Sequence, residues 1–158
     1  MPKITAILHT HNDAQRIGRA LDSVRAADEV IVIDHGSTDD TDKIARKHGA
    51  TVKDGVPGVT PGAYAIDARH DWILCLLPNE ALSDALEAAL LEWKDAEHEA
   101  DAGGYSVPIR QETGAGWESL PAETRLVNRT LVNWSEEVPA NNPESVELPG
   151  EMLRFNNP

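Results

Sequence analysis

The sequence predicts an α/β domain with a largely parallel central sheet, and the order and character of its apolar segments indicate this. Short runs rich in β-branched residues alternate with segments of helical periodicity, and turn-forming residues separate them. The runs are continuously apolar, which is typical of strands covered on both faces. Strands that alternate with helices in this way form parallel sheets through right-handed crossovers.

The first strand is expected at residues 4–8 (ITAIL), followed by the polar stretch at residues 9–12 (HTHN). A helix should come next, with Asn12 or Asp13 as its N-cap. Its apolar face has the i, i+3, i+4, i+7 spacing and consists of Ile17, Ala20, Leu21 and Val24. These segments make the first strand–helix unit.

The second unit follows directly. Residues 29–34 (EVIVID) are expected as a strand, residues 35–41 (HGSTDDT) as a turn and residues 43–48 as a helix. Gly49 stands where a helix C-terminus is expected, and residues 50–54 (ATVKD) predict a brief third strand.

A loop rich in glycine and proline is expected at residues 55–62, then a short helix at about residues 63–69. Residues 72–77 (WILCLL) predict the fourth strand. The longer helix that follows has an apolar stripe formed by Leu82, Leu86, Ala89, Leu90 and Trp93.

The last third is richer in β-type sequence. Two strands are expected, at residues 103–111 (GGYSVPIRQ) and 123–134 (ETRLVNRTLVNW), joined by a Gly-rich turn through residues 112–122. We therefore expect one domain, residues 1–158, with a nucleotide-binding half at residues 1–101 and a smaller half at residues 102–158.

Composition excludes several classes of function. The chain has 158 residues with 14 basic and 27 acidic side chains, a net charge of −13. Nucleic acid and anionic membranes would repel such a protein, so neither is an expected partner. The N-terminus lacks the pattern of a signal peptide, and no apolar run reaches the ~20 residues that cross a bilayer. A cytoplasmic location is expected, and the single cysteine, Cys75, is expected to be buried and inert.

Polar residues follow three of the predicted strands, at residues 9–12, 34–38 and 78–80. In open parallel sheets, ligands bind beyond the carboxyl ends of the strands. The three segments are therefore expected to converge on one cleft.

These segments carry a family resemblance. The stretch ITAILHTHNDAQRIGRALDSVRAADEVIVIDHGSTDDTDKIARKHGATV resembles the N-terminal half of glycosyltransferase family 2, most closely its bacterial branch for lipopolysaccharide core or related glycans. The family's DSGSTDGT and DWVLxLDADE segments correspond to DHGSTDDT and DWILCLLPNE. The resemblance covers residues 3–94 and fades over 104–134. It implies a GT-A nucleotide-diphospho-sugar transferase fold, a parallel-rich sheet flanked by helices with a shortened acceptor half.

The resemblance also implies a set of nucleotide-binding residues. They are Thr10, His11, Asn12, Asp34, Gly36 and Ser37. His11 stands where the family often has an aromatic near the uracil, and an imidazole can still stack or form a hydrogen bond there. Asp34 corresponds to the acid that recognises base or ribose, although a turn role would also suit it. Ser37 also suits helix capping, as do Thr38 and Asp39.

The chain departs from the family at the metal site. The family's Asp-x-Asp binds Mn²⁺ or Mg²⁺, which bridges the two phosphates and neutralises the leaving diphosphate. Here these positions are Leu77 and Asn79, followed by Glu80. The resemblance implies a divalent cofactor at Asn79 and Glu80 if the protein is active, but the Asp-x-Asp motif is degenerate and the site weakened.

Two other family features are altered. The acceptor side usually carries a catalytic base near a His-Glu pair, and here only Glu136 or Glu137 is available. A Lys or Arg followed by Asn usually helps to hold the diphosphate, and Ala63 and Tyr64 stand at about that point. Separately, His9, His11 and His35, with Asp34 or Glu80, suggest an alternative transition-metal site.

The leading hypothesis is a family-2-like transferase that moves a hexose from a nucleotide-sugar, of the UDP type, to a glycan or lipid-linked acceptor. The alternative is a catalytically inactive module of the same fold that binds a nucleotide or a protein partner.

Overall fold

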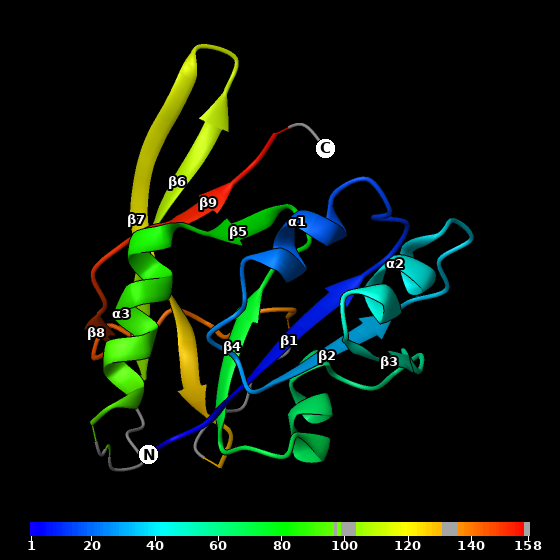
Figure 1. Ribbon diagram of the computed structural model, residues 1–158, viewed down its shortest axis with the longest axis horizontal. Helices are drawn as coiled ribbons and strands as arrows, with labels where there is room; N and C mark the ends of the chain where they lie inside the picture. The colour runs from blue at the N-terminus through cyan, green and yellow to red at the C-terminus, as the bar shows by residue number, and fades with distance from the viewer. Residues whose placement is uncertain (97, 99–103, 131–135, 157–158) are drawn as a thin grey trace.

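A computed structural model describes residues 1–96, 98, 104–130 and 136–156 (Figure 1). These residues form a nine-stranded mixed sheet with helices on both faces. The strand order is β3-β2-β1-β4-β7-β6-β9-β5, and β8 pairs with β6 outside this path. The predicted α/β class with a largely parallel first half is confirmed.

The parallel part of the sheet contains the first four strands: β1 (Ile4–Thr10), β2 (Glu29–Asp34), β3 (Thr51–Asp54) and β4 (Trp72–Leu76). β1 lies between β2 and β4 and is buried along its whole length. The register pairs Thr10 with Asp34. The polar residues after these neighbouring strands therefore leave the sheet at the same edge.

The rest of the sheet is mixed. It consists of β5 (Glu80–Leu82), β6 (Tyr105–Thr113), β7 (Gly116–Asn128), β8 (Val146–Glu147) and β9 (Met152–Arg154). β7 runs antiparallel to both β4 and β6, while β9 runs parallel to β6 and antiparallel to β5. β5 comes from the first half of the chain, so the two halves share one sheet.

The prediction of a long Gly-rich turn over residues 112–122 was wrong. β6 ends at Thr113 and β7 begins at Gly116, so a tight hairpin replaces the turn. The two strands extend well beyond the rest of the sheet (Figure 1). The residues near the end of the hairpin are polar and exposed, and no core packs against them. They therefore lack the apolar pattern from which a strand is predicted. Residues 131–134 of the expected second strand lie outside the described part of the chain.

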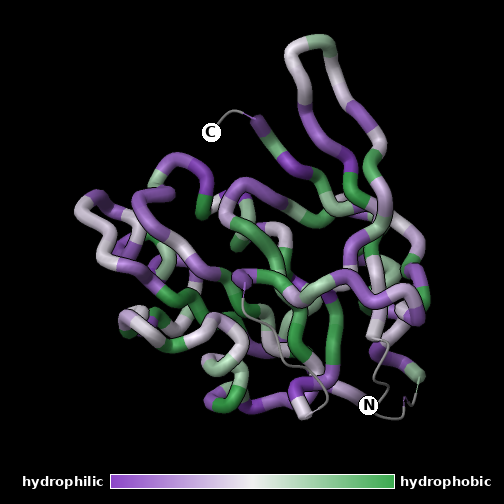
Figure 2. Tube along the Cα trace, turned by 180° about the vertical axis from the view of Figure 1, so that it is seen from behind, coloured by the Kyte–Doolittle hydropathy of each residue, from purple (hydrophilic) through white to green (hydrophobic). Residues whose placement is uncertain are grey.

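The helices α1 (Ile17–Asp22), α2 (Thr41–Lys47) and α3 (Asp84–Lys94) enclose the larger apolar core on one face of the sheet. The 3₁₀ helix η1 (Pro61–Asp67) covers a smaller core on the other face. Alternate residues of β1 serve the two cores, which explains why the strand is buried on both faces. Figure 2 shows this hydrophobic centre and the more hydrophilic loops around it.

Two expectations about the helices were wrong. α1 begins at Ile17 with Arg16 in the cap position and no side-chain cap, because the Asp13 carboxylate accepts from Thr10 and the His11 N–H instead. Leu82 belongs to β5, not to the longer helix, which begins two residues later at Asp84 with Ser83 as its N-cap. The expected short helix at 63–69 is the 3₁₀ helix η1 and begins earlier, at Pro61.

We predict that Gly150→Ala destabilises the protein more than Gly58→Ala. Both glycines have positive φ, +96° and +86°, so an alanine costs about 1–2 kcal/mol at either position. A Cβ on Gly150 would also lie 2.4 Å from the Leu86 backbone nitrogen in α3, whereas one on Gly58 meets nothing within 4 Å. Urea unfolding followed by circular dichroism should show the larger loss for Gly150→Ala, and equal losses would contradict this packing.

Candidate functional site

A cleft of about 400 Å³ opens at the carboxyl edge of the parallel strands. The turns after β1, β2 and β4 form its walls, and the segment after residue 135 contributes one more side chain. The lining residues are His9, Thr10, His11, Asp13, Arg16, His35, Leu77, Pro78, Asn79 and Glu137. The three polar segments predicted from the sequence therefore do meet around this cleft.

The Asp13 carboxylate organises the turn after β1. Its Oδ2 accepts from the Thr10 hydroxyl at 2.6 Å and from the His11 backbone N–H at 3.0 Å. Its Oδ1 lies 2.9 Å from Arg16 Nε. Asp13 thus fixes Thr10, His11 and Arg16 on one wall. Sequence reasoning missed this role and missed Arg16, although an acid three residues after a strand-end threonine was a usable signal.

The turns after β1 and β2 are held together by hydrogen bonds. The Asn12 N–H donates to Ser37 Oγ at 2.8 Å, and Asn12 Oδ1 accepts from the Thr38 N–H at 2.8 Å. Ser37 in turn donates its hydroxyl to Asp34 Oδ1 at 2.5 Å.

The structure thus divides the expected nucleotide-binding residues into two groups. Thr10 and His11 line the cleft. Asn12, Asp34 and Ser37 form the support next to it, and Gly36 lies in the same turn with φ +73°. A role for any of these residues in nucleotide binding stays a prediction.

His9 and His35 form a stacked pair among the residues that line the cleft. His9 Nδ1 lies 2.9 Å from His35 Nε2, and the ring centroids are 5.2 Å apart. Burial, followed by the charge of His35, lowers the pKa of His9 to about 4, so His9 is neutral near pH 7. Within the described residues, no group of three or more His, Cys, Asp or Glu side chains is placed to hold a metal ion. The alternative transition-metal site thus has no support from this geometry.

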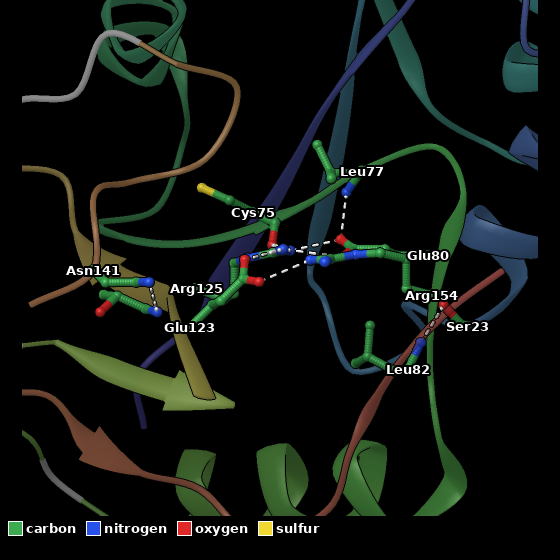
Figure 3. Close-up of polar contacts among 10 residues, drawn as sticks. Ser23, Cys75, Leu77, Glu80, Leu82, Glu123, Arg125, Asn141 and Arg154 are labelled. Atoms are coloured by element: carbon green, nitrogen blue, oxygen red, sulfur yellow. Dashed lines mark hydrogen bonds and ion pairs between the residues drawn. The ribbon is translucent and has the colours of Figure 1, made fainter. Parts of the chain in front are cut away.

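Glu80 is fully buried, is not among the residues that line the cleft, and points toward Arg125 (Figure 3). Its Oε1 accepts from Arg125 Nη1 at 2.6 Å and from the Leu77 N–H at 2.8 Å. Its Oε2 accepts from Arg125 Nη2 at 2.9 Å and from Arg154 Nε at 3.0 Å. Both carboxylate oxygens are therefore committed to protein donors.

Glu80 belongs to an ion-pair cluster with Glu123, Arg125 and Arg154. Glu123 bridges the two arginines, with Oε1 2.8 Å from Arg125 Nη2 and Oε2 2.9 Å from Arg154 Nη2. Burial opposes the charge of Arg125, but hydrogen bonds from it to Glu80 and Glu123 prevail and raise its pKa. Burial likewise opposes the charge of Glu123, and the two arginines lower its pKa.

The residues at the family's metal position do not fit a divalent ion bound to a diphosphate. Leu77 has no ligand atom, and Glu80 is withdrawn into the cluster. Asn79 lines the cleft and offers one neutral oxygen, while its Nδ2 donates to the Phe155 carbonyl at 3.4 Å. Hard cations require several oxygen ligands, preferably charged ones.

The two expected catalytic bases are placed differently. Glu136 and Glu137 are both exposed, but only Glu137 lines the cleft. Its charge acts to raise the pKa of His9, against the larger effect of burial. Tyr64, from the altered loop, is buried and accepts a hydrogen bond from the Val56 N–H at 2.7 Å, and its ring packs edge-on against His9.

A cleft at the carboxyl edge of a parallel sheet is typical of nucleotide-binding α/β folds, and comparison with solved structures places this sheet in the GT-A class of nucleotide-diphospho-sugar transferase folds. A 349-residue form of Staphylococcus aureus TarS matches 75% of this chain and 38% of its own, with a TM-score of 0.54 and 21% identity. Mycobacterium tuberculosis glucosyl-3-phosphoglycerate synthase, in complex with Mn²⁺, UDP and phosphoglyceric acid, matches 72% of this chain and 45% of its own, with a TM-score of 0.50 and 21% identity. These similarities establish the fold.

The sequence comparisons point to a family. The model described as glycosyl transferase family 2 matches residues 5–59. An uncharacterized glycosyltransferase of Rickettsia felis is 42% identical over 105 residues, which are 64% of this chain and 37% of the relative. A related protein of Rickettsia conorii is 40% identical over 103 residues, 63% of this chain and 36% of that protein. The chain is thus similar to glycosyltransferase family 2, and it spans little more than a third of these relatives.

The family resemblance and the fold implied by the sequence motifs are thus confirmed, while the branch for lipopolysaccharide core stays a prediction. Among the helices of the described residues, none has the length and apolar character to cross a membrane.

We predict that Arg125→Met costs about 3–5 kcal/mol of unfolding free energy, because it leaves the buried Glu80 carboxylate without its main partner. The control Arg110→Met breaks an exposed pair with Glu151 at 3.7 Å and should cost less than about 1 kcal/mol. Adding Glu80→Gln to Arg125→Met should recover part of the loss. Urea denaturation measures all three, and a loss for Arg125→Met no greater than the control's would refute the importance of the cluster.

We also predict that His9 makes the fold sensitive to mild acid. The pKa of His9 is about 4 in the folded state against 6.5 for the ordinary side chain, so protons bind the unfolded chain first as the pH falls. The folded state therefore has its full stability with respect to His9 above pH 6.5. It loses stability as the pH falls from 6.5 toward 4, because protonation of His9 then favours the unfolded chain. The loss should amount to about 2 kcal/mol between about pH 7 and pH 5.

The measurement compares the unfolding free energy of the parent with that of His9→Asn across this range. The variant should lose about 2 kcal/mol less on acidification. Parallel curves for the two proteins would show that His9 titrates normally.

Proposed function

We propose that the cleft binds the nucleotide part of a nucleotide-sugar, of the UDP type, and that the protein transfers a hexose to a glycan or lipid-linked acceptor. The observation that carries the proposal is the position of the cleft in a chain similar to family 2: it lies where β1, β2 and β4 end, and Thr10 and His11 line it. Ligands of open parallel sheets bind at this edge. The similar fold of the M. tuberculosis synthase, whose complex contains UDP and Mn²⁺, supports this choice of nucleotide.

Residues in the cleft and in the support next to it have separate chemical roles in the proposal. His11 offers a ring surface for the base, and Asp34, with one oxygen bonded to Ser37, offers the other to base or ribose donors. Glu137 is the better placed of the two candidate bases, because it lines the cleft and Glu136 does not. It would take the proton of the acceptor hydroxyl as that oxygen attacks the anomeric carbon and the nucleoside diphosphate leaves.

A second function is favoured by one specific observation. The Asp pair of the family is replaced by Leu77 and Asn79, and Glu80 is committed to Arg125 and Arg154. A domain that keeps the nucleotide cleft but transfers no sugar would retain this arrangement. Incubation with UDP-hexoses and measurement of released UDP, alongside UDP binding, separates the two: binding with release supports the transferase, and binding without release supports the binding module.

We predict that Asp34→Ala weakens UDP binding by at least about tenfold, because a buried carboxylate that bonds the ligand contributes about 1.4 kcal/mol or more. The matched control is Asp54→Ala: Asp54 is the β3 partner of Asp34 in the sheet register and is exposed. Calorimetric titration with UDP measures affinity, and far-UV circular dichroism checks the fold. Unchanged affinity in a folded Asp34→Ala protein would remove Asp34 from the site.

A further inference from the structure

A single arginine, Arg16, supplies the permanent positive charge among the residues that line the cleft. The charged or titratable side chains that line it are His9, His11, Asp13, Arg16, His35 and Glu137. His9 is neutral near pH 7, since burial lowers its pKa to about 4. Arg16 is the lining side chain that carries a positive charge at any physiological pH.

Asp13 fixes the direction of this guanidinium. The carboxylate is almost fully buried and bonds the Thr10 hydroxyl and the His11 N–H through the oxygen that Arg16 does not use. Its second oxygen lies 2.9 Å from Arg16 Nε. The Arg16 side chain remains 38% exposed. A guanidinium bound through Nε still has its two terminal nitrogens, whose fork geometry matches phosphate oxygens.

The part of the cleft formed by the turn after β4 lacks the carboxylate ligands that a divalent metal needs. Leu77, Pro78 and Asn79 line it, and the carboxylate of Glu80 is turned into the protein. β1 and β4 are neighbours in the sheet, so Arg16 and the former metal position border the same cleft. A diphosphate in this cleft would thus lie near the fixed guanidinium of Arg16. It would find no pair of carboxylates at residues 77–79 to hold a metal ion for it.

We infer that the cleft binds the diphosphate of its nucleotide directly, with the Arg16 guanidinium, held by Asp13, as the cationic partner in place of a divalent metal. The inference rests on the proposed function, because it concerns how the same nucleotide is held. Arg16 supplies in fixed form part of the positive charge that a metal would bring. Two charge-assisted hydrogen bonds to phosphate oxygens are the contacts it offers.

The test is calorimetric titration of the parent and Arg16→Gln with UDP, each with Mn²⁺ and with EDTA. The control is Arg46→Gln, because Arg46 makes the same kind of pair, Nε to Asp42 Oδ1 at 2.9 Å, on α2 outside the cleft. The parent and the control should bind UDP within about twofold in both buffers. Arg16→Gln should bind at least about tenfold more weakly in EDTA, with an unchanged urea unfolding midpoint.

The outcomes separate the inference from the proposed function. UDP binding by the parent only with Mn²⁺ would overturn the inference and keep the proposed function. Metal-free binding that Arg16→Gln leaves unchanged would overturn the role of Arg16. Absence of UDP binding by the parent in both buffers would overturn the proposed function itself.

Discussion

The buried ion pair between Glu80 and Arg125 is the interaction on which the arrangement of the sheet and the cleft depends. Glu80 begins β5, Arg125 lies on β7, and Arg154 at the end of β9 completes the contact. A buried charge that loses its partner costs several kcal/mol, so these strand segments are stable only when they are assembled together. The cluster thereby joins the nucleotide half of the chain to the antiparallel strands.

The same cluster shapes one wall of the cleft. Glu80 accepts from the Leu77 N–H, and the Asn79 backbone oxygen accepts from the Phe155 N–H at 2.8 Å. The loop between β4 and β5 is thus held by the first residue of β5 and by the residue that follows β9. The carboxylate that a sequence alignment offers as a metal ligand is a structural anchor here, because two arginines and a backbone N–H already saturate its oxygens.

The sequence predicted best the elements whose stability is local or fully buried. β1, β2 and β4 are mostly apolar and largely buried, and the turns after them carry residues that meet at the cleft. β5 and β9 have three residues each, too few to show a period, and their pairing is set by contacts far apart in the chain. A buried arginine such as Arg125 could not be predicted, because its partner Glu80 lies 45 residues away.

The electrostatics of the cleft must be local, since the chain as a whole is strongly acidic. A net charge of −13 opposes the approach of an anionic nucleotide, but at physiological salt this field is screened beyond about 8 Å. What decides binding is therefore the charge within contact distance. There, one oxygen of the Asp13 carboxylate pairs with Arg16, and the other accepts hydrogen bonds from the Thr10 hydroxyl and the His11 N–H. These contacts reduce the repulsion between Asp13 and a phosphate. The Asp13–Arg16 pair thus lets a single fixed guanidinium face an anion within an acidic protein.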